Sequence, residues 1–545
     1  MKFRKGGGAK RHCTHSAMPA SNSVGEREEQ HSLYSIEQSI SPPDTDRTMS
    51  VFPALTLVVS FLLPLFFLLL SWRRHKKYQF LPPGPAPLPF LGTPKYIGDV
   101  AALKYYPELC KKYGPLFTLW KGMDPVVVLC GYEVIKDALL KHAEEFSGRP
   151  YTAVTEHYSG GHGFGSSNGE RWCQLRRFSV ALLKNHGSHK MDIEKLVSEE
   201  TQSLVQAVSQ HEGKAFNSYN LMAGAAGNMI MHRLIGKRFD YEDPDLQEII
   251  EVARDFILNF HCTLHEIANT FPILIRMPII NQKIFKASSH MKSLVQNFID
   301  QHKQTLNPAA PRDFTDLFLM KIKEEEHMPG SHFCENNLLI SLIDMIGAGF
   351  DATSFSTNFS LVLISNYPEE QRKVQQEIDD VTQSLRPPGF MDRAQMPYTN
   401  AVIHEIQRVL DLAPTAHYHA VTKDTQFRGY TLPKGTTVSP FLTSVHYDST
   451  QWETPNEFNP GHFLDEKGQF RTRPAFMPFS AGPRICAGEA HARMTLFTLF
   501  AVLLQKFTFT PPPGTERQDL KSLTLDRDTT VLITQVCAIP RSVSA

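Results

Sequence analysis

The chain has 545 residues, of which 41% are hydrophobic, so it can bury a large core, and its 56 lysines and arginines balance 56 aspartates and glutamates. A chain without net charge offers no broad basic surface, so we expect no nucleic-acid partner. The eight cysteines include no Cys-x-x-Cys pair, which argues against a disulfide framework and against a structural zinc site. We therefore expect mostly free thiols in a reducing compartment.

The N-terminal region divides into an extension and an apolar run. Residues 1–48 are polar and poor in large apolar side chains, which predicts disorder. Residues 49–72 contain an uncharged apolar run, 51–70, long enough to cross about 30 Å of lipid hydrocarbon, and we expect a transmembrane anchor here. A buried helix fits less well because the run lacks a polar face, and a cleaved signal peptide fits less well because its apolar core would be shorter and its positive charge would come first, whereas Arg73, Arg74, Lys76 and Lys77 follow this run. Met49 stands before the run, and translation from there would omit the extension.

A basic and proline-rich linker, residues 73–92, follows the anchor. Its four leading basic residues, by the positive-inside tendency, place the rest of the chain in the cytosol. Its prolines fix φ and predict a stiff, extended connector. Long apolar-periodic stretches without repeats then predict one mainly helical domain over residues 93–545. Short strand-like runs at 125–130, 429–438, 507–509 and 530–536 indicate a small β region.

The strongest chemical pattern is at residues 479–488, Phe-Ser-Ala-Gly-Pro-Arg-Ile-Cys-Ala-Gly. Gly482 can adopt backbone angles closed to other residues, and Gly488 leaves room for a flat ring to approach. Backbone N–H groups near Cys486 can hydrogen-bond to an anionic sulfur, and Arg484 can neutralise a carboxylate of a bound group. The pattern therefore indicates a tight ligand loop around a thiolate.

These ten residues match the haem-binding signature Phe-x-x-Gly-x-Arg-x-Cys-x-Gly, so the chain resembles the cytochrome P-450 superfamily, over about residues 81–540. The resemblance implies a mainly α fold with a small β region, one catalytic domain behind the membrane helix, and haem b as cofactor. It implies that Cys486 holds the haem iron as a thiolate, which favours O–O cleavage. It places Phe479 and Arg484 at the haem as well.

Further segments agree with the resemblance in their order along the chain. Glu405-Ile-Gln-Arg408 resembles the family's Glu-x-x-Arg helix, which we take as structural. Without the resemblance, Glu405 and Arg408 would be an ordinary surface pair on one helical turn. In the segment 458–463, His462 stands where the family normally completes this ion-pair cluster with an arginine. That arginine is also absent from many members of the microsomal drug-metabolising branch, family 2, which this segment resembles.

The resemblance also places residues at the haem propionates. Trp172 and Arg176 resemble the family's Trp-x-x-x-Arg helix, and their spacing of four puts both on one helical face. His419 occupies the position where family 2 members carry a propionate-binding histidine; the alternative is a hydrogen-bonded core histidine.

We expect electrons to come from another protein, because the glycine-rich stretch 160–169 lacks the spacing of a dinucleotide loop. That stretch is predicted to be a mobile loop. The resemblance implies the NADPH-cytochrome reductase as partner, docking on the basic proximal face, with cytochrome b5 as a second candidate. Candidate contacts are Arg171, Arg177, Lys184 and Lys190.

Residues 338–364 predict a long apolar helix with Gly347-Ala-Gly-Phe-Asp-Ala-Thr-Ser354 at its middle. The two glycines each weaken helix propensity by about 1 kcal/mol, which suggests a loosened turn where dioxygen binds. The resemblance makes Asp351 the acid that feeds protons, and Asp351 and Thr353 are the catalytic candidates. Ala352, however, occupies the position of the family's threonine. Thr353 is turned by about 100° from it on a helix, so its hydroxyl cannot simply replace the missing one.

The substrate pocket is placed by resemblance alone. Ala348 and Phe350 on the long helix, Ala413 after the Glu-x-x-Arg helix, and His417 are the candidate lining residues. His417 stands where relatives carry an apolar residue, and an outward-facing histidine is an equal alternative. An apolar cavity suits lipophilic substrates such as xenobiotics, fatty acids or steroids.

The expected protein is a single-pass enzyme of the endoplasmic reticulum membrane, in contact with membrane lipid. Its expected activity is NADPH-dependent monooxygenation. The loss of the threonine also leaves open a haem-thiolate isomerase or dehydratase that acts on lipid peroxides without NADPH. A haem-binding sensor without catalytic activity is the third class.

Overall fold

The computed structural model describes residues 76–541 apart from 185–192, 261–262 and 526–532, together with isolated residues between 60 and 73. The chain separates into two units, Met1–His75 and Lys76–Ala545, and this boundary falls inside the predicted linker. The predicted disordered extension and most of the predicted anchor lie outside the described residues. Among the residues described, one helix, Glu335–Asn366, is long and apolar enough to cross a membrane, but most of it is buried inside the protein.

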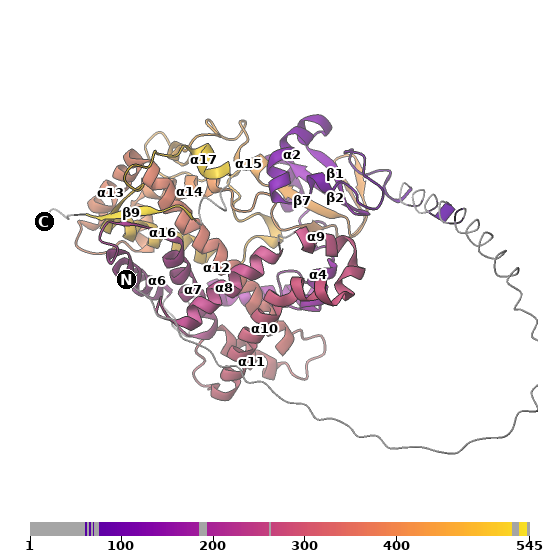
Figure 1. Cartoon of the computed structure of the whole chain (residues 1–545), viewed down its shortest axis with the longest axis horizontal. Helices are drawn as coiled ribbons and strands as arrows, with labels where there is room; N and C mark the ends of the chain where they lie inside the picture. The colour runs from indigo at the N-terminus through magenta and orange to yellow at the C-terminus, as the bar shows by residue number, and fades with distance from the viewer. Residues whose placement is uncertain are drawn as a thin grey trace, which may run out of the picture. The chain divides into compact units, whose positions relative to one another are not determined.

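The second unit is mainly helical, as the sequence predicts (Figure 1). The helices with full α-helical geometry are α2 (Asp99–Tyr113), α3 (Tyr132–Lys136), α4 (Ala153–Ser159), α5 (Gly169–Lys184), α6 (Ile193–Ser209), α7 (Tyr219–Ile235), α8 (Pro244–Phe260), α9 (Thr263–Thr270), α10 (Pro278–Thr305), α11 (Phe314–Glu324), α12 (Glu335–Asn366), α13 (Pro368–Thr382), α14 (Pro397–Leu410), α15 (Thr443–His446), α16 (Glu489–Lys506) and α17 (Leu520–Leu525). Short helical turns are η1 (Pro94–Tyr96), η2 (Asp137–Lys141), η3 (Pro272–Arg276), η4 (Phe390–Gln395), η5 (Pro460–Phe463) and η6 (Gly482–Arg484).

Helix α12 is the central element of this unit, with α7, α8, α10 and α16 packed against it. Its sequence is apolar on all sides, the pattern of a helix surrounded by protein. It ends at Asn366 because Pro368, which opens α13, cannot continue the hydrogen-bond ladder. The predicted loosened turn is wrong: the helix runs unbroken through both glycines. Packing accounts for one of them: a Cβ at Gly349 would lie a tight 3.2 Å from Ile230, whereas a Cβ at Gly347 would be in ordinary contact, 3.4 Å from Phe256.

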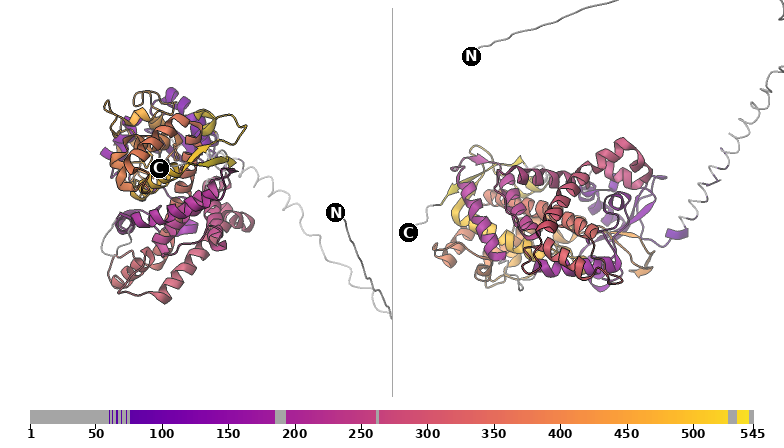
Figure 2. Two further views of the ribbon diagram at one scale, coloured as in Figure 1. Left: turned by 90° about the vertical axis from the view of Figure 1, so that its left-hand side faces the viewer. Right: turned by 90° about the horizontal axis from the view of Figure 1, so that it is seen from below.

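The β structure is small and lies at two ends of the unit (Figure 2). One sheet has the order β1-β2-β7-β4, with β1 (Leu116–Lys121) antiparallel to β2 (Asp124–Cys130), and β2 parallel to β7 (Thr437–Phe441), which pairs with β4 (His419–Ala420). The other has the order β3-β9-β8, formed by Ala215–Phe216, Val536–Pro540 and Phe507–Thr510, and β5 (Thr425–Phe427) pairs with β6 (Tyr430–Leu432). The predicted run 429–438 is divided between β6 and β7, because Pro433 and Gly435 form a turn.

Two hydrophobic cores meet along α12. Residues from Leu338 to Phe350 pack with α7, α8 and α10, whereas residues from Phe355 to Ile364 pack with α14 and α16. The segment 351–354 lies where one core gives way to the other. The predicted catalytic segment therefore occupies a packing junction on an otherwise rigid helix.

Candidate cysteine-centred active site

Cys486 lies in a loop that backbone hydrogen bonds hold between η6 and α16. Its N–H donates to the carbonyl of Phe479 at 3.0 Å, and the N–H of Ile485 donates to Gly482 at 3.0 Å. Gly482 has a φ of 75°, and a Cβ there would lie 2.1 Å from the carbonyl oxygen of Leu139. A side chain at position 482 is therefore excluded, both by backbone conformation and by the close approach of η2.

The Cys486 sulfur is enclosed by protein yet open to a space. Burial raises the pKa of its thiol, while the N–H groups of Gly488 and Glu489 and the charge of Arg176 lower that pKa. The residue is nonetheless solvent-accessible, so an open space adjoins it despite the surrounding protein. A Cβ on Gly488 would lie 3.9 Å from this sulfur and would take part of that space. Because burial dominates, the thiolate form requires a cation at the sulfur.

Arg484 and Trp172 converge beside this loop. The guanidinium of Arg484 lies 3.9 Å from the centre of the Trp172 ring. Its Nε donates to the carbonyl of Ser147 at 2.7 Å, and one terminal nitrogen donates to the carbonyl of Ser167 at 2.8 Å. The other terminal nitrogen is buried without a hydrogen-bond partner, and so is the indole Nε1 of Trp172. Two neighbouring buried donors thus have no protein acceptor, which is rare in folded proteins.

Arg149 and Arg176 join Arg484 in a cluster of positive charge. Arg176 donates to the carbonyl of Ile485, next to the cysteine. Burial, then the charges of Arg149 and Arg176, lower the pKa of Arg484 to about 8. Burial and Arg176 lower the pKa of Arg149 to about 9. In the described part of the chain no carboxylate forms an ion pair with these three arginines, so their charge is unbalanced.

His419, on β4, is buried next to the same cluster. Its Nδ1 lies 2.7 Å from the carbonyl oxygen of Phe146. Burial and the charge of Arg149 lower the pKa of His419 to about 3, so the ring is neutral. A neutral ring that donates through Nδ1 carries no proton on Nε2. His419 can therefore donate to an anion through Nε2 only after it takes up a proton.

Sequence reasoning did not identify Arg149. It precedes Pro150, which favours an extended conformation, and it donates to the carbonyls of His417 at 3.1 Å and Tyr418 at 2.8 Å. These bonds hold the loop that contains His417 against Arg149, beside the other two arginines of the cluster. The available signal was a lone Gly-Arg-Pro in a mainly polar stretch, which carries little information without a structure.

The donor set fits haem b. A thiol that needs a cation suits the iron, and unbalanced arginines with two unpaired donors suit the two propionate carboxylates. The sequence-predicted residues Cys486, Arg484, Trp172, Arg176 and His419 are thus brought together. Phe479 lies at the start of the same loop, with the Arg493 guanidinium 5.0 Å from its ring centre.

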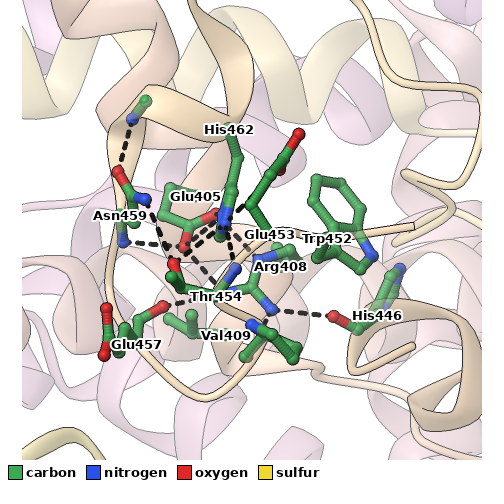
Figure 3. Close-up of polar contacts among 12 residues, drawn as sticks. Glu405, Arg408, Val409, His446, Trp452, Glu453, Thr454, Glu457, Asn459 and His462 are labelled. Carbon is green, nitrogen blue, oxygen red and sulfur yellow. Dashed lines mark hydrogen bonds and ion pairs between the residues drawn. The ribbon is translucent and has the colours of Figure 1, made fainter. Parts of the chain in front are cut away.

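Glu405 and Arg408 are both fully buried, so they are not a surface pair (Figure 3). Arg408 donates to both carboxylate oxygens of Glu405, at 2.7 and 2.8 Å. Its terminal nitrogens also donate to the carbonyls of His446, Pro455 and Glu457, at 2.7–2.9 Å. One guanidinium therefore joins α14 to the irregular segment that precedes the cysteine loop.

The central segment of α12 presents one accessible face. Ala348 is exposed, and Asp351 and Ala352 are partly exposed, although the helix around them is buried. Thr353 is buried, on another face from Ala352. Phe350 is fully buried, and its ring contacts the position of Gly227 on α7 so closely that a Cβ there would lie 2.7 Å away. The structure therefore does not place Phe350 on the accessible face with Ala348.

Asp351 lies near α7 and α8. Burial, followed by the charge of Asp351, raises the pKa of Tyr219 to about 12, and Arg254 lowers it. The acid thus shares its surroundings with a tyrosine hydroxyl and an arginine. Ala413 and His417 are both exposed, in the loop between α14 and β4.

The glycine-rich stretch is fastened to α12, which corrects the prediction of a mobile loop. Asp344 accepts hydrogen bonds from the N–H groups of Gly165 at 2.9 Å and Phe164 at 3.2 Å. The Oδ1 of Asn337 accepts from the N–H of Gly163 at 3.1 Å. The glycines permit this contact, because a Cβ on Gly163 would lie 2.6 Å from the Asp344 carboxylate. Sequence reasoning missed Asp344, which stands seven residues before Asp351 in the same apolar helix.

A separate cleft of about 610 Å³ lies between η4, α14 and residues 469–476. Its lining includes Arg393, Arg473 and Arg493 but no acidic residue, and no predicted site residue. Of the predicted partner contacts, Arg177 is exposed, whereas Arg171 donates to the carbonyl of Gly161. The Lys184 side chain and Lys190 lie outside the described part of the structure.

Comparison with known proteins gives consistent matches. The family model described as Cytochrome P-450 matches residues 82–533. Cytochrome P-450 2C20 of Macaca fascicularis is 41% identical over 501 residues, 90% of this chain and 100% of the relative. Cytochrome P-450 2B4 of Oryctolagus cuniculus is 40% identical over 471 residues, 86% of this chain and 95% of the relative. Cytochrome P-450 2F2 of Mus musculus is 42% identical over 444 residues, 81% and 90% respectively.

Proposed function

The chain belongs to the cytochrome P-450 family, and from that premise we propose that it inserts one oxygen atom from O2 into lipophilic small molecules. Xenobiotics, fatty acids and steroids are the candidate substrates. The observation that carries the proposal is Cys486, which an open space adjoins, beside three arginines that lack carboxylate partners. Haem b, held by the Cys486 thiolate, supplies reductive activation of O2.

The chain's own residues bind and orient the haem. Arg484, Arg176 and Arg149 neutralise its carboxylates, and Trp172 Nε1 donates to one of them. These bonds satisfy the two buried donors that the protein alone leaves unpaired. Burial lowers the pKa of His419 most, and the charges of Arg149 and Arg484 lower it further; the negative charge of bound carboxylates would offset the arginine part and favour a protonated ring that donates to them.

On the α12 side of the proposed haem site, Asp351 is the residue that delivers protons, because it lies on the accessible face of this helix. Ala348 lines the substrate space, and Ala413 and His417 are the further candidates. Ala352 offers no hydroxyl beside Asp351, and the buried Thr353 does not supply one on that face. Proton delivery therefore depends on water, which favours release of hydrogen peroxide over substrate oxidation.

Electrons reach the site from the NADPH-cytochrome reductase, with cytochrome b5 as an additional donor. Two observations support docking beside the cysteine loop: Arg177 is exposed, and the cleft with three arginines includes Arg493 of α16, the helix that follows the loop. Arg473 pairs with Glu453 and Arg493 with Glu489 there, so an acidic partner would compete with these carboxylates for the arginines. We place the enzyme in the endoplasmic reticulum membrane, anchored through residues 49–72, with the catalytic domain in the cytosol.

Reconstitution with the reductase tests this function. The protein would be incubated with NADPH and a panel of lipophilic substrates, and NADPH use, peroxide release and oxygenated product would be measured. Product that requires NADPH and carries label from ¹⁸O2 is expected. Absence of any NADPH-driven product across the panel, with intact haem-thiolate absorbance, would refute the proposal.

A second function, isomerisation or dehydration of lipid peroxides, is favoured by one observation, the alanine at position 352. Such chemistry needs neither NADPH nor O2. A fatty-acid hydroperoxide given to the enzyme without NADPH decides between the two, because only the isomerase or dehydratase consumes it at a catalytic rate.

A further inference from the structure

Cys110 and Cys130 lie together in the unit's N-terminal part, at a distance in sequence from every residue of the proposed active site. Cys110 is in the last turns of α2, and Cys130 ends β2. The N–H of Gly114 caps α2 on the carbonyl of Cys110 at 2.9 Å, and the N–H of Cys130 donates to the carbonyl of Pro115 at 2.8 Å, which joins the end of β2 to the segment that directly follows α2. Both side chains belong to the core between α2 and the sheet.

The two thiols interact directly. A side-chain hydrogen bond from Cys130 lowers the pKa of Cys110 to about 7, against the opposing effect of burial. The same bond and burial raise the pKa of Cys130. Cys110 is partly exposed, whereas Cys130 is buried. The pair thus has an accessible thiol that ionises near neutral pH and an inner thiol that stays protonated, the arrangement of an attacking and a resolving cysteine.

We propose that Cys110 and Cys130 are a peroxide-sensitive dithiol that closes to a disulfide. The Cys110 thiolate attacks hydrogen peroxide, the O–O bond breaks, and a sulfenic acid and hydroxide form. The Cys130 sulfur then attacks the Cys110 sulfur, and the sulfenic oxygen leaves as water. Two thiols and one peroxide give one disulfide and two waters, with two electrons passing from sulfur to peroxide. The bond would fasten α2 to the end of β2.

The hydrogen peroxide has a source in the same molecule, an inference that rests on the proposed function. Turnover without the hydroxyl at position 352 releases hydrogen peroxide, which reaches Cys110 without leaving the vicinity of the protein. Formation of the Cys110–Cys130 disulfide would then report turnover in which NADPH is used and hydrogen peroxide, in place of product, is released. Added peroxide tests the dithiol without any turnover.

The holoenzyme would be treated with stoichiometric hydrogen peroxide while an azole occupies the haem iron, and then digested for mass spectrometry. A peptide linking Cys110 to Cys130, reversible by dithiothreitol, is expected. In Cys130→Ser, dimedone should trap a sulfenic acid on Cys110; in Cys110→Ser, Cys130 should stay reduced. Cys334, exposed, serves as the internal control. Oxidation of Cys334 as fast as Cys110, or of Cys110 without the linked peptide, would overturn the proposal.

Two further measurements sharpen the test. Iodoacetamide at neutral pH should alkylate Cys110 roughly tenfold more slowly in Cys130→Ala, because this substitution removes the hydrogen-bond donor that lowers the pKa of Cys110. A rate unchanged by that substitution would contradict the contact. NADPH-driven turnover, with and without catalase, tests the peroxide source separately: if added peroxide forms the disulfide and turnover does not, the dithiol stands and the link to uncoupling fails.

Discussion

The Nδ1 atom of His462 lies 3.2 Å from both carboxylate oxygens of Glu405. On its other side, the backbone N–H of Thr454 donates to Nε2 at 3.2 Å, so Nε2 is the acceptor and Nδ1 carries the proton. His462 is therefore a neutral donor at the position where the family resemblance expects an arginine. Arg408 supplies the permanent positive charge that balances Glu405, and the exposed Glu453 carboxylate lies 3.8 Å from the Nε2 of His462 at the edge of this cluster (Figure 3).

Replacing His462 tests this role. In His462→Leu, Glu405 loses a donor and the Thr454 N–H loses its acceptor, both inside the protein. A cost of about 1–3 kcal/mol in the free energy of unfolding is expected. Urea unfolding would measure it, with His290→Leu as the control, since His290 is exposed and pairs with Glu248 at the surface. Equal effects of the two substitutions would contradict the buried role of His462.

Arg408 should matter more, because it carries the charge. Arg408→Leu leaves the Glu405 carboxylate buried without its counter-ion and is expected to cost about 3–5 kcal/mol, with loss of most haem-containing protein. The matched control is Arg372→Leu, which breaks a pair of the same spacing at the surface and should change stability by less than about 1 kcal/mol. The double variant Glu405→Leu/Arg408→Leu should lose less than Arg408→Leu alone; a larger loss would show that charge is not the cause.

Asp344 predicts a pH dependence of stability. Burial raises its pKa from 3.8 to about 7, against the bonds from Gly165, Phe164 and Tyr158, so the folded state holds a proton that the unfolded state has lost. This stabilisation is complete below the unfolded pKa of about 4 and disappears as pH rises through about 7, by at most about 4 kcal/mol. Asp344→Asn should remove that slope while keeping acceptance from the two N–H groups.

The measurement compares unfolding free energies at about pH 5 and about pH 8 for the protein and for Asp344→Asn. A smaller difference in the variant is expected. Identical pH profiles would mean that Asp344 stays ionised in the folded state.

The parts of the site that could be predicted from sequence are those carried by fixed spacing. Cys486, Arg484, Trp172 and Arg176 lie in segments whose local patterns have a chemical reason, and the structure brings them together. Arg149 and Asp344 were missed because their roles arise from contacts between segments far apart in the chain, which no local pattern encodes. The same limit explains the wrong prediction for the glycine-rich stretch.

Long elements were likewise predicted better than short ones. The periodicity of α12 and the run in β2 specify structure locally. β1 was missed, and it exists through its pairing with β2. The glycines of α12 were predicted to loosen the helix because propensity was considered alone. In the folded protein the surrounding packing keeps the helix continuous, at a cost of about 1 kcal/mol of propensity for each glycine, and Gly349 leaves room for Ile230.

Arg484 should control haem retention. In Arg484→Gln, the donor that lacks a protein partner is lost together with its charge, at a cost of about 1.5–3 kcal/mol, or roughly ten- to hundredfold faster haem release. Transfer of haem to apomyoglobin would measure the rate. Arg177→Gln, an exposed arginine on α5, is the control and should release haem at the original rate. Equal release from both variants would place the carboxylates elsewhere.

If the alanine at position 352 limits proton delivery, as we propose, a pair of substitutions separates the effect of a hydroxyl from the effect of side-chain size. Ala352→Thr adds a hydroxyl on the accessible face of α12, whereas Ala352→Val adds the same bulk without it. One hydrogen bond of about 1 kcal/mol corresponds to a roughly fivefold shift in partitioning, so the threonine variant should release less peroxide and form more product per NADPH. The valine variant should leave both the peroxide release and the product formed per NADPH unchanged. If both behave alike, bulk and water exclusion govern coupling. A further substitution, Thr353→Val, tests the assignment of the accessible face of α12. If this variant alone forms no product while its haem-thiolate absorbance is intact, the buried Thr353 hydroxyl reaches the site through a rearranged α12. The assignment of the accessible face is then wrong.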